Sequence, residues 1–86
     1  MKRDAVIQFI RACVAHLTGR PELEHVLDEQ GQLQEYGIDS VALINLVVMI
    51  EQKFAIFYED EELIEENFSS LHIVAERLLE KLGAKI

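Results

Sequence analysis

Three stretches of this chain repeat their apolar residues every three or four positions, and this spacing restricts what the chain can fold into. Such an interval places side chains on one face of an α-helix, whereas a half-buried strand needs strict alternation. The first stretch predicts a helix over residues 4–17, with Phe9 beside a stripe of Val6, Ile10, Cys13 and Leu17. The second predicts a helix over residues 40–54. The third predicts a helix ending at about Leu82, with Leu71, Val74, Leu78 and Leu82 on one face.

Residues that favour helix ends frame these stretches. Short polar side chains cap helix starts, and glycine or proline terminates helices. The expected caps are Asp4 for the first helix, Asp39 or Ser40 for the second and Ser69 or Ser70 for the third, and the expected stops are Gly19, Pro21 and Gly83.

Two connections join the helices. The first, residues 18–36, is long for a compact domain, and Val26, Leu27 and Leu33 are expected to hold it against the core. In the second, strand-like alternation over residues 55–58 precedes one or two helical turns, which Leu63, Ile64 and Phe68 are expected to hold down. The sequence therefore predicts an all-α fold in one domain over residues 1–86, a four-helix bundle of three main helices and one short helix with a long first loop.

Charge and composition narrow the function classes. The formal net charge is −8 at pH 7, which argues against nucleic acid and anionic membranes as partners and favours a basic protein partner. No apolar run reaches the roughly 18 residues that span a bilayer, and the N-terminus lacks a signal-peptide pattern. A cytoplasmic location is expected. Cys13 is the single cysteine, so no internal disulfide can form, and it is expected in the core.

The sequence predicts neither a catalytic group nor a metal site. Acidic residues crowd residues 59–66, but this stretch lacks the alternating Asp/Asn ligands and central glycine of an EF-hand loop. A solvated acidic face that can steer a basic partner is the favoured interpretation, with calcium binding as a weaker alternative. His16 and His25 receive no role, and His72 has no obvious partner group.

Ser40 is the most informative single residue. It follows the turn residue Gly37 and the capping residue Asp39, and it stands at the start of the apolar helix over residues 40–54. Its hydroxyl is therefore expected to be reachable. A helix N-terminus carries partial positive charge and unpaired N–H groups, so a phosphate attached there would be favoured. On these residues alone, an ordinary N-cap is the simpler interpretation.

The wider pattern resembles a known family. Residues 33–41, Leu-Gln-Glu-Tyr-Gly-Ile-Asp-Ser-Val, resemble the signature of acyl and peptidyl carrier proteins, and the likeness continues through residues 50–54 and 66–71. It covers residues 33–82 well and residues 1–32 loosely. The resemblance implies a free-standing carrier whose Ser40 is esterified to 4′-phosphopantetheine. It also implies that Asp39 helps a phosphopantetheinyl transferase to recognise the site.

The helix over residues 40–54 carries a second apolar stripe. Leu43, Leu46, Val47, Ile50 and Phe54 share one arc, which is the expected core face. Val41, Ile44 and Val48 form a separate stripe, for which periodicity leaves two interpretations open: a helix buried on most sides, or an exposed docking strip. The resemblance favours docking. Many carriers of fatty-acid synthesis have acidic residues along this helix, but here the first acid is Glu51, so contacts with partners are expected to be more apolar.

The leading hypothesis is a non-enzymatic carrier that holds acyl or aminoacyl groups as thioesters and presents them to loading and downstream enzymes. The apolar second helix and the Glu-Glu-Asn-Phe segment favour secondary-metabolite pathways of polyketide or nonribosomal type. A fatty-acid-synthesis carrier is one alternative, and an unmodified acidic helical interaction module, with Ser40 only as a cap, is another. A monomer is expected because carriers pass between enzymes. The motif does not identify the cargo or the pathway.

Overall fold

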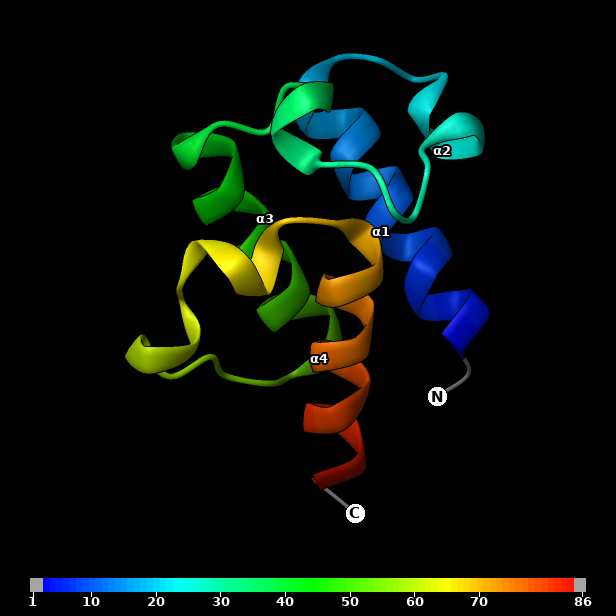
Figure 1. The fold of residues 1–86 in the computed structure, drawn as a ribbon. Helices are drawn as coiled ribbons and strands as arrows, with labels where there is room; N and C mark the ends of the chain where they lie inside the picture. The colour runs from blue at the N-terminus through cyan, green and yellow to red at the C-terminus, as the bar shows by residue number, and fades with distance from the viewer. Residues whose placement is uncertain (1–2, 85–86) are drawn as a thin grey trace.

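The computed structural model describes residues 3–84, and these residues form an all-α bundle (Figure 1). Apart from one isolated bridge between Gln32 and Ser70, they contain no strand pairing. Between residues 3 and 84, no helix is both long and apolar enough to cross a membrane. The elements are α1 (Arg3–Thr18), α2 (Leu23–Val26), η1 (Leu33–Tyr36), α3 (Ser40–Phe54), η2 (Asp60–Glu62), η3 (Glu65–Phe68) and α4 (Leu71–Ala84).

Helix α1 lies at the centre of the packing, because α2, α3 and α4 all contact it. Its buried face continues into those of the other helices to form one core. The Phe9 ring from α1 meets the Phe54 ring from α3 edge to face, with 5.4 Å between ring centroids. Such aromatic contacts add to the hydrophobic burial that drives folding. The fully buried side chains include Val6, Ile10, Cys13, Leu46, Ile50, Leu71, Val74 and Leu78.

The predicted main helices are confirmed, and two of the predicted ends are wrong. Helix α3 has the predicted bounds, Ser40–Phe54. Helix α1 begins at Arg3, so Asp4 lies inside its first turn and does not precede it. Helix α4 runs through Gly83 to Ala84, since a glycine weakens a helix without having to end it. The cap of α4 is Ser70, whose Oγ accepts a 3.2 Å hydrogen bond from the backbone N–H of Ile73.

The first connection contains the short α-helix of the bundle. Leu27 and Leu33 are buried as predicted, but Val26 is exposed and Leu23 is buried in its place. Positions four apart share a helix face, so the single turn of α2 directs Leu23 and Leu27 to the core and leaves Val26 outside.

The second connection differs from the prediction in its helical turns. Ile56 and Tyr58 are buried and Phe57 is exposed, which confirms the alternation over residues 55–58. The turns that follow, η2 and η3, are 3₁₀ turns. Leu63 and Ile64 are 46% and 43% exposed, so the expectation that they hold this segment down is wrong, and Phe68 alone of the three is buried.

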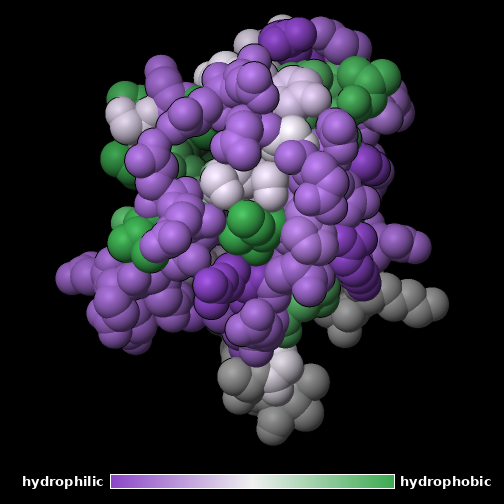
Figure 2. All heavy atoms as spheres, in the orientation of Figure 1, coloured by the Kyte–Doolittle hydropathy of each residue, from purple (hydrophilic) through white to green (hydrophobic). Residues whose placement is uncertain are grey.

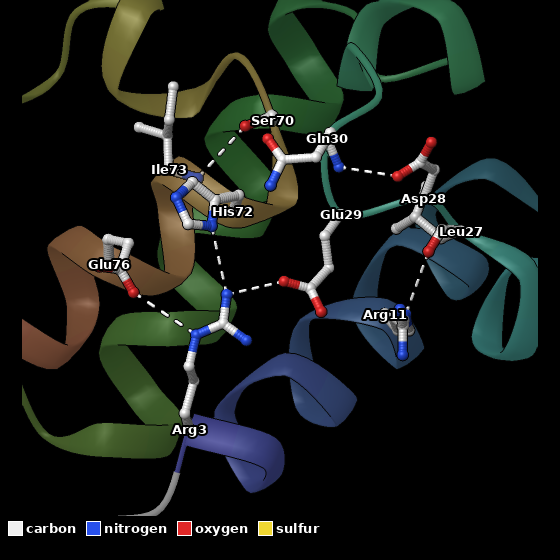
Figure 3. A network of polar contacts seen from close by, with 10 residues as sticks. All are labelled: Arg3, Arg11, Leu27, Asp28, Glu29, Gln30, Ser70, His72, Ile73 and Glu76. Carbon is white, nitrogen blue, oxygen red and sulfur yellow. Dashed lines mark hydrogen bonds and ion pairs between the residues drawn. The ribbon is translucent and has the colours of Figure 1, made fainter.

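A polar cluster on Arg3 joins three segments that are far apart in sequence (Figure 3). Arg3 Nη2 lies 2.7 Å from a Glu29 carboxylate oxygen and 3.2 Å from His72 Nδ1. Its Nε donates to Glu76 at 3.5 Å, and the His72 backbone N–H donates to the Glu29 carbonyl at 2.8 Å. The hydrogen bond from Arg3 holds the pKa of Glu29 below its usual range. His72 thus does have a partner, and the cluster fixes the first connection to the starts of α1 and α4.

Candidate functional site

The turn before Ser40 is held by backbone hydrogen bonds and by one glycine. The N–H of Gly37 donates to the carbonyls of Leu33 and Gln34, and that of Ile38 donates to Leu33 at 3.1 Å. Gly37 has a φ of 105°, a backbone conformation that residues other than glycine rarely adopt. The turn therefore ends in a fixed position, with the Ile38 side chain buried beneath it.

Asp39, and not Ser40, is the cap of α3. Its Oδ1 accepts a 2.8 Å hydrogen bond from the Ala42 N–H, and its backbone is extended, as at most N-caps. Ser40 is the first residue of the helix and is exposed. Its side chain is thus not needed to close the helix end, and its hydroxyl stands at the positive end of a 15-residue helix.

A groove with a volume of about 910 Å³ opens beside Ser40. One wall comes from the start of α3 and the other from residues 64–69, with residues 32–34 between them. Two hydrogen bonds fix these parts to each other: Gln34 Nε2 donates to Glu65 Oε1 at 2.6 Å, and the Leu33 N–H donates to the Ser69 carbonyl at 2.9 Å. The apolar residues of the lining are Leu33, Ile38, Leu43, Ile64 and Phe68, and its carboxylates are Asp39, Glu65 and Glu66.

The second apolar stripe of α3 faces outward. Val41, Ile44 and Val48 are 66%, 64% and 43% exposed, which excludes the interpretation that α3 is buried on most sides. Figure 2 shows hydrophobic residues gathered over the start of α3, surrounded by a mostly hydrophilic surface. On the core side, Leu46, Val47, Ile50 and Phe54 are buried as predicted, and Leu43 is partly buried. We refer to Val41, Ile44 and Val48 as the α3 strip.

Within residues 3–84, the remaining reactive groups form no second centre. No group of three or more His, Cys, Asp or Glu side chains in this range could hold a metal ion. The Cys13 thiol is buried, and burial raises its pKa to about 11. A thiol with this pKa carries almost no thiolate at neutral pH, and thiolate is the nucleophilic form.

The comparison with protein families shows to which family the chain belongs. The family model for a phosphopantetheine attachment site matches residues 8–78, most of the chain. The chain belongs to the phosphopantetheine-attachment family. The prosthetic group of this carrier domain is covalent 4′-phosphopantetheine. Carrier domains of this kind interact with phosphopantetheinyl transferases and with biosynthetic enzymes. Neither the curated proteins nor the solved structures gave a match to the chain.

The carrier domain fits such a group around Ser40. A hydroxyl can be esterified only if a transferase can reach it, and Ser40 is exposed. The first turn of α3 offers N–H groups and a positive helix end, which favour a phosphate diester. The adjoining groove offers apolar wall residues, Leu43, Ile64 and Phe68, along which a flexible arm can lie.

Sequence reasoning missed the far wall of this groove. The sequence pattern indicates that Ile64 holds its segment down and that Glu65 and Glu66 belong to a solvated acidic face, and it does not relate any of the three to Ser40. The structure places all three on the lining shared with Ser40. No local pattern could show this, because the contact joins residues about 25 positions apart. Gly31 makes room for the ring that precedes the Gly37 turn, because an added Cβ there would lie 2.8 Å from Tyr36 Cε2.

Proposed function

We propose that Ser40 is the residue that carries 4′-phosphopantetheine and that Asp39 holds the start of α3 in the form that the transferase recognises. The observation that carries this proposal is the position of the Ser40 side chain, exposed at the first residue of α3 while Asp39 caps the helix. The transferase joins the serine oxygen to the phosphorus that bears the pantetheine part of coenzyme A, and the nucleotide part leaves. Ser40 loses a proton and gains a phosphodiester at a positive helix end.

The domain itself supplies position and not chemistry. The thiol at the end of the arm carries an acyl or aminoacyl group as a thioester, and partner enzymes load, modify and remove it. The contribution of this chain is to anchor the arm at a fixed helix start, beside a groove that can receive part of the arm and its cargo. We expect this exchange in the cytoplasm, between a monomeric single domain and successive enzymes.

The α3 strip is proposed as the docking surface for these enzymes. Its three side chains lie on the helix that begins at Ser40, and contiguous exposed apolar side chains tend to mark partner sites. Residues 40–50 contain no charged side chain, so a partner contacts this part of α3 through apolar groups. Together with the Glu-Glu-Asn-Phe segment, residues 65–68, this supports a carrier of polyketide or nonribosomal type over a carrier of fatty-acid synthesis.

Mass spectrometry after incubation with coenzyme A and a broad-specificity transferase tests the attachment. The expected result is a gain of one phosphopantetheinyl group, located by peptide mapping to the peptide that contains Ser40. A folded protein whose mass does not change would leave Ser40 as an ordinary surface residue and the chain as an unmodified interaction module. If the group is attached, competition between cargo-loading enzymes of the two pathway types would assign the pathway.

A further inference from the structure

Phe57 is presented to solvent by a segment whose neighbouring residues are fixed in the core. Helix α3 ends at Phe54, its C-cap Ala55 adopts a left-handed φ of 54°, and the chain continues in extended form. Ile56 and Tyr58 are buried, whereas Phe57 is 76% exposed, more than any other large hydrophobic side chain among the described residues. In Figure 1 this segment lies at the end of α3 opposite the turn that precedes Ser40.

The base under Phe57 is rigid. The Tyr58 backbone N–H donates to Glu51 Oε2 at 2.9 Å, and the Tyr58 ring meets the Phe68 ring at 5.6 Å between centroids. Lys81 Nζ lies 5.1 Å above the Tyr58 ring. An aromatic side chain on a fixed backbone loses little conformational entropy on binding, which is why such residues often dominate protein interfaces.

A hollow of about 700 Å³ adjoins Phe57. Tyr58 also lines this hollow, but its hydroxyl is enclosed by the protein, so a group bound in the hollow does not reach it, and the hydroxyl makes no hydrogen bond to any of the described residues. The lining consists of residues 55–58 and the side chains of Glu62, Asn67, Arg77, Glu80 and Lys81.

The charges around the hollow are mostly negative. Glu59, Asp60 and Glu61 follow directly along the chain and are all exposed. The lining itself holds two acidic residues, Glu62 and Glu80, and two basic ones, Arg77 and Lys81. Lys81 is paired with Glu62 at 2.8 Å, so the excess of negative charge comes from residues 59–61. The surface therefore attracts a basic partner and repels an acidic one.

We propose that Phe57, the adjoining hollow and the acidic residues 59–61, together called the Phe57 surface, form a second docking site for a polypeptide segment of a partner. The segment has an apolar side chain that packs against Phe57 in the hollow, and Lys or Arg residues on either side. Fourteen helical steps separate Ser40 from Phe54, about 21 Å at 1.5 Å each. One partner can thus hold the domain at the Phe57 surface while an enzyme works at Ser40.

The α3 strip and the Phe57 surface select different partners, and this difference provides the test. Both expose apolar side chains, but the α3 strip lies in a run without charged residues, 40–50, whereas three consecutive carboxylates, residues 59–61, follow closely after Phe57. We would titrate the intact, isotope-labelled protein with a ten-residue peptide of alternating lysine and leucine and follow backbone amide shifts by NMR. Saturable shifts are expected in residues 55–61 and 77–81, and a lysine–serine peptide should bind at least about tenfold more weakly.

Variants identify the groups involved. Phe57→Ser should weaken binding about tenfold or more, as loss of an aromatic anchor does. Val26→Ser, a change of an exposed apolar residue on α2, should bind like the parent protein. Ser40→Ala should also bind normally, which separates this proposal from the attachment site. The proposal is overturned if the shifts are largest in residues 41–48, if binding does not saturate, or if Phe57→Ser leaves it unchanged.

Discussion

The Asp39 carboxylate accepts a 2.8 Å hydrogen bond from the backbone N–H of Ala42, three residues along the chain. This contact closes the start of α3 without the Ser40 side chain. A cap is worth about 1 kcal/mol of folding free energy. The serine proposed for modification is thus relieved of a structural task, and the two neighbouring residues can be separated by mutation.

Asp39→Ala should lower the free energy of unfolding by about 1 kcal/mol and slow loading of Ser40 by a transferase. Asp39→Asn is the matched variant, since asparagine caps helices as well as aspartate does but has no charge. If Asn restores both stability and loading, the cap positions Ser40. If it restores stability alone, the transferase recognises the charge. Loading that is unaltered in Asp39→Ala would make the residue merely structural. Chemical denaturation and single-turnover labelling measure the two effects.

Ser40→Ala should abolish loading and leave the fold intact. Ser40 does not cap α3, and alanine is the better helix former, so the stability should change by less than about 0.5 kcal/mol. Circular dichroism and thermal denaturation report the fold, and mass spectrometry reports the labelling. Full labelling of this variant would place the attachment at another residue.

Ile44→Gln and Leu46→Gln have the same chemistry on opposite faces of α3. Ile44 is exposed on the α3 strip and Leu46 is fully buried. The exposed change should alter stability by no more than about 0.5 kcal/mol and reduce turnover by a partner enzyme. The buried change removes core packing and buries an amide, at a cost of roughly 2–5 kcal/mol. Equal losses of melting temperature in the two variants would mean that the α3 strip does not behave as a surface.

Tyr58→Phe should remove an alkaline sensitivity. Burial, and then the nearby carboxylates of Glu62 and Glu51, raises the pKa of Tyr58 to about 12. The folded pKa exceeds the usual value of about 10, so the folded state favours the protonated Tyr58 hydroxyl. The stability that this preference contributes is complete below about pH 10 and is lost as the pH rises toward 12. The variant should lack this loss. At pH 7 it should be as stable as the parent, or more stable by about 1 kcal/mol, because the unpaired hydroxyl is gone. Denaturant midpoints at pH 7 and pH 11 compare the two proteins.

Glu29→Gln should change the response to acid. The hydrogen bond from Arg3 lowers the pKa of Glu29 in the folded protein, so its contribution is present above the unfolded value of about 4.3. It is lost as the pH falls through the folded value. The stability difference between parent and variant should therefore shrink as the pH is lowered from 6 to 3. A difference that is constant over this range would show that the ion pair is not the cause.

The long helices could be predicted from sequence because each repeats its pattern over three or four turns. For α3, even the bounds and the core residues Leu46, Ile50 and Phe54 are confirmed. Short elements could not be predicted as well. A single turn offers too few apolar positions to fix its inward face, which is why Val26, Leu63 and Ile64 were wrongly expected in the core and the buried Leu23 was not expected there.

The site was predicted in part. The spacing from Gly37 to Ser40 predicts an exposed serine at a helix start. It does not show whether Asp39 or Ser40 is the cap, because the two candidates are adjacent in the sequence. Periodicity placed the residues of the α3 strip on one face of the helix, but it could not show whether another element covers that face. The groove wall from residues 64–69 depends on packing between distant segments, such as the Leu33–Ser69 hydrogen bond. No local pattern contains that information.

The central place of α1 has a consequence for biosynthesis. Helix α4, which begins at Leu71, packs on α1, so the part of the α1 face that α4 covers cannot be buried until residues 71–84 have been made. At about 5–20 residues per second, translation of residues 19–70 takes roughly 3 to 10 s. During this time that part of the α1 face remains unburied by α4, and slower codons in this interval would lengthen its exposure.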